Sequence, residues 1–299
     1  MKNVLIIGCG LLGSSLVRRI SKKKIEKTIF VYEKSLSNIA KIKKLRLPVK
    51  IIKSLKDGVV SSDLIIFCTP MSEYKKLIIK INKFILQKTL ITDIGSSKNE
   101  SSKIIKKFLK KNIHWIRSHP ITGSEVSGPE HGKDNLFEDK WCVLIKDKKT
   151  NLRHLRFLNS FWKKIGSKTV IMNAEKHDKI FSITSHLPHL IAYNLVKSAQ
   201  DFEKLLKFNL IKYSAGGLRD FSRIAASNEI MWRDIFFDNK LNVTKAIDLF
   251  IKNLRAFKKD INSKNNKSIL RKLVQTKKVR SKIIRLKQDI DKPNFGRDI

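Results

Sequence analysis

The sequence predicts an α/β protein with a parallel sheet in its N-terminal part and only helices in its C-terminal part. Three observations support this prediction. Short, continuously apolar runs, typical of strands buried on both faces of a parallel sheet, alternate with helical stretches over residues 1–172. A glycine-rich turn directly follows the first of these runs. From Asn173 onward the strand-like runs stop and helical periodicity takes over.

The first strand is predicted at residues 4–7 and is followed by Gly8-Cys9-Gly10-Leu11-Leu12-Gly13. In this spacing Gly8 permits a tight turn, Gly10 lets the backbone approach a pyrophosphate, and Gly13 lets the next helix pack close to the strand. The free N–H groups at the start of that helix would face the phosphates. We therefore predict a Rossmann-like dinucleotide site that includes Leu11 and Leu12. The alternative is a tight turn that binds nothing.

A helix over 14–20 and a strand over 28–32 follow, and Glu33 closes that strand 20 residues after Gly13. A carboxylate at this position can accept hydrogen bonds from both hydroxyls of an adenosine ribose. It also repels a 2′-phosphate, so the sequence predicts NAD in preference to NADP. Lys34, directly beside it, weakens this preference a little.

The alternation continues through the rest of the first domain. Thr69 and Pro70 follow the buried strand predicted at 63–68, where open α/β sheets bind their ligands. We therefore expect both residues in the cofactor site. The other predicted elements are helices over 39–45, 74–84, 101–110 and 151–164, and strands over 49–52, 89–92, 113–116, 141–145 and 169–172.

Ser96 and His119 each come after a predicted strand, the strands at 89–92 and 113–116. The carboxyl ends of parallel strands meet at one edge of the sheet, beside a bound nicotinamide. Histidine, with an unperturbed pKa of about 6.5, is suited to proton transfer near neutral pH. A hydroxyl and an imidazole there suit the removal of a proton from an alcohol while hydride leaves its carbon. The alternative for His119 is a structural histidine at a strand end.

Helices are predicted in the second part over residues 177–200, 202–213, 228–237 and 240–261. A basic tail over 263–290 carries a helix-compatible apolar stripe. His186 and His189, three residues apart, would lie roughly on one face of a helix. Neither a third histidine nor a carboxylate has matching spacing, so we predict no metal.

Arg219 and Arg223 follow the Gly216-Gly217 pair and are four residues apart. Guanidinium groups bind carboxylates in a bidentate geometry, so either arginine could anchor an acidic substrate. The alternative is an ordinary ion pair at the surface or between helices.

The net charge of +38 raises the question of a nucleic-acid or acidic-membrane partner. The lysines are spread over nearly every predicted helix, with few aromatics among them, which favours a coding bias instead. Three cysteines without a close pair, Cys9, Cys68 and Cys142, indicate a reducing cytoplasm. No apolar stretch reaches the ~18 residues of a membrane span, so we predict none.

Six motifs follow one another along residues 3–260 in a recognisable order. They are Gly8-Cys9-Gly10-Leu11-Leu12-Gly13-Ser14-Ser15, Asp93-Ile94-Gly95-Ser96-Ser97-Lys98, His119-Pro120-Ile121-Thr122-Gly123-Ser124-Glu125, Ser185-His186-Leu187-Pro188-His189, Gly216-Gly217-Leu218-Arg219-Asp220-Phe221-Ser222-Arg223-Ile224-Ala225 and Met231-Trp232-Arg233-Asp234-Ile235. Together they resemble the prephenate/arogenate (cyclohexadienyl) dehydrogenases of tyrosine biosynthesis.

The resemblance implies a Rossmann-like domain over 1–172, a helical substrate and dimerisation domain over 173–262, and a basic helical tail over 263–299. It implies NAD-dependent oxidative decarboxylation of prephenate to 4-hydroxyphenylpyruvate, or of arogenate to tyrosine, in a homodimer. His119 would accept the proton of the ring 4-hydroxyl. Ser96 would hydrogen-bond both that hydroxyl and His119.

The resemblance also implies the substrate contacts. Arg223 would bind a substrate carboxylate and His189 would hold the pyruvyl side chain. Four further residues would shape the pocket: Ser124, where many members have threonine, together with Glu125, Asp220 and Trp232. No regulatory amino-acid-binding domain is expected after the helical domain, because a basic tail follows it.

Two other classes of protein stay open from the sequence. A β-hydroxyacid dehydrogenase has the same two-domain plan but depends on a catalytic lysine, and Lys176 and Lys179 lack the glycine-rich context. A basic nucleic-acid-binding protein would explain the charge but not the ordered motifs.

Overall fold

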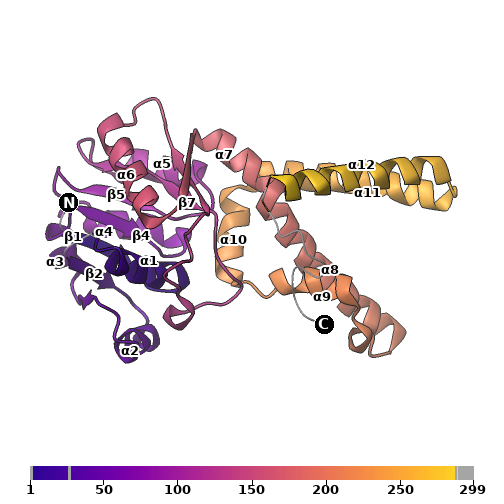
Figure 1. Ribbon diagram of the computed structural model, residues 1–299, viewed down its shortest axis with the longest axis horizontal. Helices are drawn as coiled ribbons and strands as arrows, with labels where there is room; N and C mark the ends of the chain where they lie inside the picture. The colour runs from indigo at the N-terminus through magenta and orange to yellow at the C-terminus, as the bar shows by residue number, and fades with distance from the viewer. Residues whose placement is uncertain (1–2, 26–27, 287, 289–299) are drawn as a thin grey trace. The chain divides into compact units, whose positions relative to one another are not determined.

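A computed structural model describes residues 3–25, 28–286 and 288 of the chain (Figure 1). Its first part contains a parallel six-stranded sheet in the order β3-β2-β1-β4-β5-β6. This order confirms the predicted Rossmann-like sheet, because the direction of winding reverses between β1 and β4. The strands are β1 (Asn3–Ile7), β2 (Thr28–Tyr32), β3 (Lys50–Ile51), β4 (Leu64–Phe67), β5 (Leu90–Asp93) and β6 (His114–Trp115).

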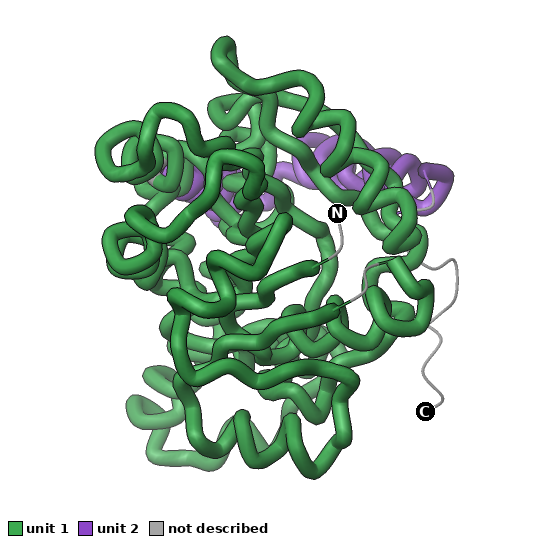
Figure 2. The backbone as a smooth tube through the Cα atoms, turned by 90° about the vertical axis from the view of Figure 1, so that its left-hand side faces the viewer, with its two compact units in different colours: residues 1–243 green, residues 244–299 purple. Residues whose placement is uncertain are grey.

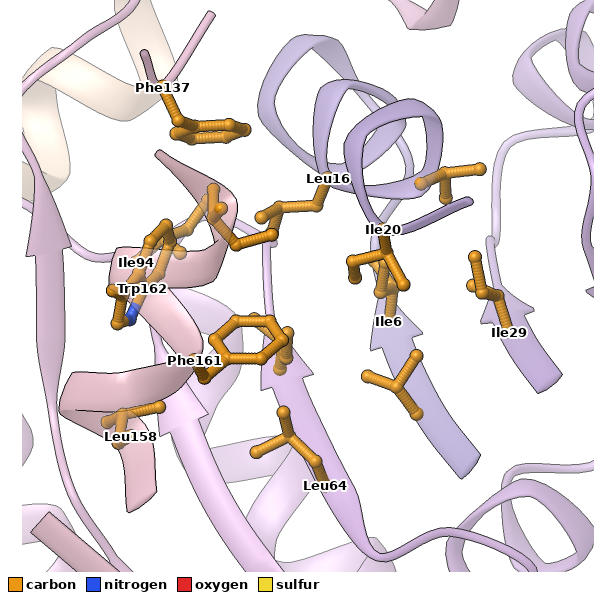
Figure 3. Packing of buried hydrophobic residues seen from close by; sticks show 14 of the residues in the cluster. Ile6, Leu16, Ile20, Ile29, Leu64, Ile94, Phe137, Leu158, Phe161 and Trp162 are labelled. Carbon is orange, nitrogen blue, oxygen red and sulfur yellow. The ribbon is translucent and has the colours of Figure 1, made fainter. Parts of the chain in front are cut away.

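The central strands β1 and β4 are almost entirely apolar because helices cover both faces of the sheet. On one face α1 (Leu11–Lys22) and α6 (Leu152–Ile165) bury Leu16, Phe161 and Trp162 against the strands, as Figure 3 shows. The other face packs against α3 (Leu55–Val60), α4 (Tyr74–Ile81) and α10 (Glu229–Asp238). Helices α2 (Leu36–Lys44) and α5 (Asn99–Phe108) complete the connections between the strands.

A second, three-stranded sheet was not predicted. It consists of β7 (Ser118–Pro120), β8 (Trp141–Ile145) and β9 (Lys168–Met172), in that order. His119 follows β6, as the sequence predicted, but it also lies within a further strand, β7, opposite Val143 of β8. The sequence did not predict β7, because residues 118–120 pair with a strand more than 20 residues further along, which local periodicity cannot reveal.

The helices after the second sheet begin with α7 (Ala174–Phe181), which passes through one π-helical turn (Ser182–His186) into α8 (Leu187–Leu206). The separate helix predicted over 202–213 was wrong: α8 continues to Leu206 and stops where Lys207 adopts a left-handed conformation with φ 50°. Helix α9 (Gly216–Ile224) then starts at the glycine pair.

The chain divides into two compact units, residues 1–243 and 244–299 (Figure 2). Helix α11 (Lys240–Asn262) starts in the first unit, and α12 (Asn266–Arg285) belongs to the second. Within the second unit Asp260 joins the two helices, accepting hydrogen bonds from Ser268 and Lys272. The described part of the basic tail is therefore helical, whereas residues 289–299 lie outside the described residues. The predicted domain boundaries at 172 and 262 stay predictions.

Candidate active site

The glycine turn lies at the end of β1, beside the end of β4. Gly8 has a φ of 91°, and a side chain there would meet the Cys68 carbonyl oxygen at 2.9 Å. A Cβ on Gly13 would lie 2.2 Å from the carbonyl oxygen of Gly8, so α1 packs closely against the turn. At Gly10, by contrast, no heavy atom lies within 4 Å of the Cβ position, which leaves room for a ligand.

The start of α1 suits an anion. Gly10 is its N-cap residue and provides no side-chain hydrogen bond, and the first turn contains no acidic residue. The first turn, with Leu11 and Leu12, therefore keeps its backbone N–H groups and its partial positive charge available for a phosphate.

Glu33 is held beside this turn. Its Oε2 accepts the Cys9 N–H at 2.8 Å, and its Oε1 accepts the Ser35 N–H at 2.9 Å. Each carboxylate oxygen keeps a further lone pair, so both can also accept a ribose hydroxyl. Thr69 lies across the turn, its methyl group 3.0 Å from the Cβ position of Gly8. Its buried Oγ1 has no partner among the described residues, and Pro70 follows it. The residues present fit a dinucleotide.

His119 is a buried imidazole. Its Nδ1 lies 2.8 Å from Nε2 of His177. Its ring packs edge-on against the ring of Phe181, with the ring centroids 4.8 Å apart. Burial lowers the pKa of His119 well below 6.5, and nearby His177, Lys98 and His186 lower it further. The neutral form, which can accept a proton, is therefore the resting form near pH 7.

The loop after β5 carries Ser96, and contacts of Lys98 hold this loop in place. Lys98 Nζ lies 2.6 Å from Asp93 Oδ2 and also donates to the Ser118 carbonyl oxygen, in β7, at 2.7 Å. Among the described residues, the predicted hydrogen bond between Ser96 and His119 is not formed. The hydrogen bond of the His119 ring is made by its Nδ1, and its partner is His177.

His186 lies close to both Ser96 and His119. It is completely buried, and burial lowers its pKa to about 4, with the Ser96 backbone opposing that shift. Its Nδ1 lies 3.2 Å from Asn239 Nδ2. Lys98, two residues after Ser96, donates to the carbonyl oxygen of Ser118, directly before His119, so the predicted catalytic pair shares one neighbourhood.

A second group of side chains contains most of the predicted substrate residues. The ring of His189 stacks on Trp232 with centroids 3.8 Å apart. Arg223 is half exposed on α9 and forms an ion pair with Glu125, in which Arg223 Nη1 lies 3.2 Å from Glu125 Oε2. Burial lowers the pKa of His189, and the charge of Arg223 lowers it further.

Two of the predicted substrate residues lie beside this group. Ser124 Oγ is 3.4 Å from the Glu125 carboxylate. Asp220 precedes Arg223 by three residues on α9, so it shares a side of that helix.

Sequence reasoning missed His177 and Asp178, which connect to His119 from the first turns of α7. His177 Nδ1 lies 2.7 Å from Asp178 Oδ1. A His-Asp pair near a helix start was visible, but nothing local linked it to a residue 58 positions earlier. Within the described residues, no group of three or more His, Cys, Asp or Glu side chains is placed to hold a metal ion. No described helix combines the length and apolar character of a membrane span.

The fold and this site define a dinucleotide-binding dehydrogenase. The family model for the prephenate dehydrogenase nucleotide-binding domain matches residues 16–171, and the model for the prephenate dehydrogenase dimerization domain matches 173–275. The chain belongs to the prephenate dehydrogenase family, which confirms the resemblance seen in its motifs.

Three relatives illustrate this membership. A cyclohexadienyl dehydrogenase of Zymomonas mobilis is 31% identical over 97% of this chain and 98% of its own length. A prephenate dehydrogenase of Lactococcus lactis is 32% identical over 94% of this chain and 77% of its own. The crystal structure of prephenate dehydrogenase from Aquifex aeolicus, in complex with hydroxyphenyl propionate and NAD+, is 32% identical. It has a TM-score of 0.88 and covers 95% of this chain and 98% of that one.

Proposed function

We propose that the protein catalyses the NAD-dependent oxidative decarboxylation of prephenate to 4-hydroxyphenylpyruvate, with arogenate, which would give tyrosine, as a second or alternative substrate. One observation carries the proposal: His119 is anchored at the carboxyl edge of the nucleotide-binding sheet, because Ser118 donates to the Asp93 carbonyl oxygen at 2.7 Å. The Zymomonas mobilis relative, a cyclohexadienyl dehydrogenase matched over nearly its whole length, supports the choice of substrates.

The cofactor would be held by the glycine turn, with Gly8, Gly10, Leu11, Leu12 and Gly13 at the pyrophosphate. Glu33 would bind the adenosine ribose, and Thr69 and Pro70 would line the other wall. NAD, when bound, supplies the acceptor for a hydride. The Glu33 carboxylate favours NAD over NADP because a 2′-phosphate would lie against a negative charge.

His119 would accept the proton of the substrate's ring hydroxyl, with Ser96 orienting that hydroxyl in a near-attack geometry. Oxidation of the hydroxyl-bearing carbon leaves a dienone, and loss of CO2 makes the ring aromatic, so the protein need only deprotonate and orient. Arg223 would bind a substrate carboxylate and His189 the side chain. Ser124, Glu125, Asp220 and Trp232 would form the rest of the pocket.

The working form would be a homodimer built through the helical domain. The family model for a dimerization domain, matched over 173–275, supports this part of the proposal. A cytoplasmic location is proposed because Cys9, Cys68 and Cys142 are all free thiols.

The test is an assay of the purified full-length protein with prephenate or arogenate and with NAD or NADP, followed at the absorbance of the reduced nicotinamide. Reduction with prephenate and NAD is expected to be the fastest of the four combinations. Turnover of a simple β-hydroxyacid, with no turnover of either cyclohexadienyl substrate, would refute the proposal.

A polyanion resin tests the nucleic-acid alternative. If the protein leaves the resin at modest salt, its net positive charge alone explains the binding, and no nucleic-acid function is required.

A further inference from the structure

Three buried side chains form one hydrogen-bonded line that ends at His119. Asp178 Oδ1 lies 2.7 Å from His177 Nδ1, and His177 Nε2 lies 2.8 Å from His119 Nδ1. Asp178 and His177 are completely buried, and His119 is 8% exposed. The proposed chemistry uses only the last residue of this line. Burying two further ionisable groups is costly unless they have partners, so their role requires an explanation.

Both oxygens of Asp178 accept hydrogen bonds from backbone N–H groups. Its Oδ1 accepts the Lys98 N–H and its Oδ2 accepts the Asn99 N–H, each at 2.9 Å. These N–H groups belong to the start of α5, where the helix dipole favours a negative charge. Asn239 Nδ2 also holds the Asp178 carbonyl oxygen at 2.8 Å. Burial raises the pKa of Asp178, and the two backbone N–H donors and the charge of Lys98 oppose that shift. The contacts fix the carboxylate in place, and we take it as the ionised acceptor.

The direction of each hydrogen bond follows from that carboxylate. Since Asp178 accepts, His177 must carry its proton on Nδ1, and a neutral imidazole then has a lone pair on Nε2. His119 must in turn donate its Nδ1–H to this lone pair. The lone pair of His119 consequently lies on Nε2, which has no hydrogen-bond partner among the residues described.

We propose that His177 and Asp178 are positioning residues that fix His119 in the tautomer with a free Nε2 lone pair and hold its ring while it takes the substrate proton. This inference rests on the proposed function. In the step itself the substrate O–H bond breaks and an Nε2–H bond forms. The electron pair left on oxygen forms the C=O bond as hydride leaves the carbon for the nicotinamide. His119 becomes an imidazolium whose Nδ1–H still points at neutral His177, and no proton moves on to Asp178.

Other groups face His119 and must be considered with this line. Lys98 and His186 lie close enough for their charges to act on it, and Phe181 packs against both imidazole rings. The Lys98 ammonium is already paired with Asp93, and among the described residues neither Lys98 nor His186 is hydrogen-bonded to the ring of His119. The alternative role for Asp178 is that of a cap for α5 alone, which would leave the tautomer of His119 unaffected.

Two substitutions of His177 separate these roles. His177→Phe keeps an aromatic ring but removes the acceptor, whereas His177→Gln keeps an amide oxygen that can accept from His119 Nδ1. We expect kcat to fall by about 10²- to 10⁴-fold in His177→Phe, with the KM for substrate and the Kd for NAD within about two-fold of the parent values. His177→Gln should regain most of the loss. His154→Phe, a histidine outside the site, serves as the control for replacing an imidazole by a phenyl ring and should keep the parent kcat.

A measurement on the unmodified protein keeps the inference testable even where a variant does not fold. Nitrogen-15 NMR of labelled histidines distinguishes protonated from unprotonated ring nitrogens. His119 and His177 are both expected to be protonated on Nδ1 and unprotonated on Nε2. The opposite tautomer at His119, or parent-like kcat in a folded His177→Phe variant, would overturn the inference. A protein that turns over neither cyclohexadienyl substrate would refute the proposed function, and the NMR result would still decide the tautomer.

Discussion

Lys98 Nζ lies 2.6 Å from Asp93 Oδ2, and both side chains are completely buried. The pair closes the loop that carries Ser96. The same ammonium donates to the Ser118 carbonyl oxygen in β7, next to His119, and Trp115 Nε1 donates to the other oxygen of Asp93 at 2.9 Å. One buried ion pair therefore ties together the two segments that carry the proposed catalytic residues.

Replacing Lys98 by methionine should destabilise the protein strongly. The change leaves the Asp93 carboxylate buried without its cation, which typically costs about 3–5 kcal/mol of unfolding free energy. Urea denaturation followed by circular dichroism measures this loss. Lys106→Met, at an exposed position on helix α5, which begins directly after Lys98, is the matched control and should stay within about 0.5 kcal/mol of the parent. Equal stability of the two variants would contradict the role given to the ion pair.

His119→Asn should abolish most of the turnover and leave the cofactor site intact. Losing a general base typically lowers the rate by about 10²- to 10⁴-fold. The binding of NAD should be unaffected because the side chain of His119 makes no contact with the glycine turn. Steady-state kinetics give kcat, and fluorescence titration gives the Kd for NAD. A variant with parent-like kcat would remove His119 from its proposed role.

Arg223→Ala should raise the KM for prephenate, by about 10- to 100-fold, because each tenfold loss corresponds to ~1.4 kcal/mol and a charged hydrogen bond contributes more than this. The KM for NAD should not change. Arg219→Ala, on the same helix α9 and also exposed, is the matched control and should behave like the parent. An effect of Arg219→Ala as large as that of Arg223→Ala would mean that general positive charge, and not a specific contact, binds the substrate.

Glu33→Ala should weaken the binding of NAD and reduce the preference of the enzyme for NAD over NADP. The substitution removes the carboxylate expected at the ribose and also the hydrogen bond to the Cys9 N–H. The KM for NAD is expected to rise about tenfold, a loss of ~1.4 kcal/mol, while the KM for NADP falls or stays the same. Glu175→Ala, an exposed carboxylate paired with Lys179, controls for the general loss of one negative charge. An unchanged ratio of the two KM values would exclude Glu33 from cofactor choice.

The stability of the protein should decrease in acid because of its buried histidines. Burial lowers the pKa of His186 to about 4, from 6.5. Between these values the unfolded chain binds a proton that the folded protein does not, so unfolding is favoured as pH falls. The free energy of unfolding should therefore drop below pH 6.5 by up to ~1.4 kcal/mol per pH unit for this residue.

Substitution of His186 tests that slope. A His186→Gln variant should show a shallower dependence of unfolding free energy on pH between 6.5 and 4, measured by urea denaturation at several pH values. His131→Gln, at an exposed histidine, should keep the parent slope. Identical slopes in all three proteins would show that His186 titrates alike in the folded and unfolded states.

Much of the fold could be predicted because its signals are local. The apolar runs predicted β1, β2, β4 and β8 to within about one residue, since a strand buried on both faces needs apolar residues throughout. The second sheet could not be predicted in the same way. Its strands β8 and β9 were predicted as strands, but β7 is only three residues long and depends on a partner strand that lies far along the chain.

The sequence by itself determined the glycine turn, the acidic end of β2 and the residue types at the site, because these depend on the spacing of neighbouring residues. Only the tertiary structure decided which side chains meet. It joined His119 to His177 and Asp178 across 58 residues, and Arg223 to Glu125 across 98. Such contacts depend on how whole elements pack, and the local pattern of apolar and polar residues does not encode that packing.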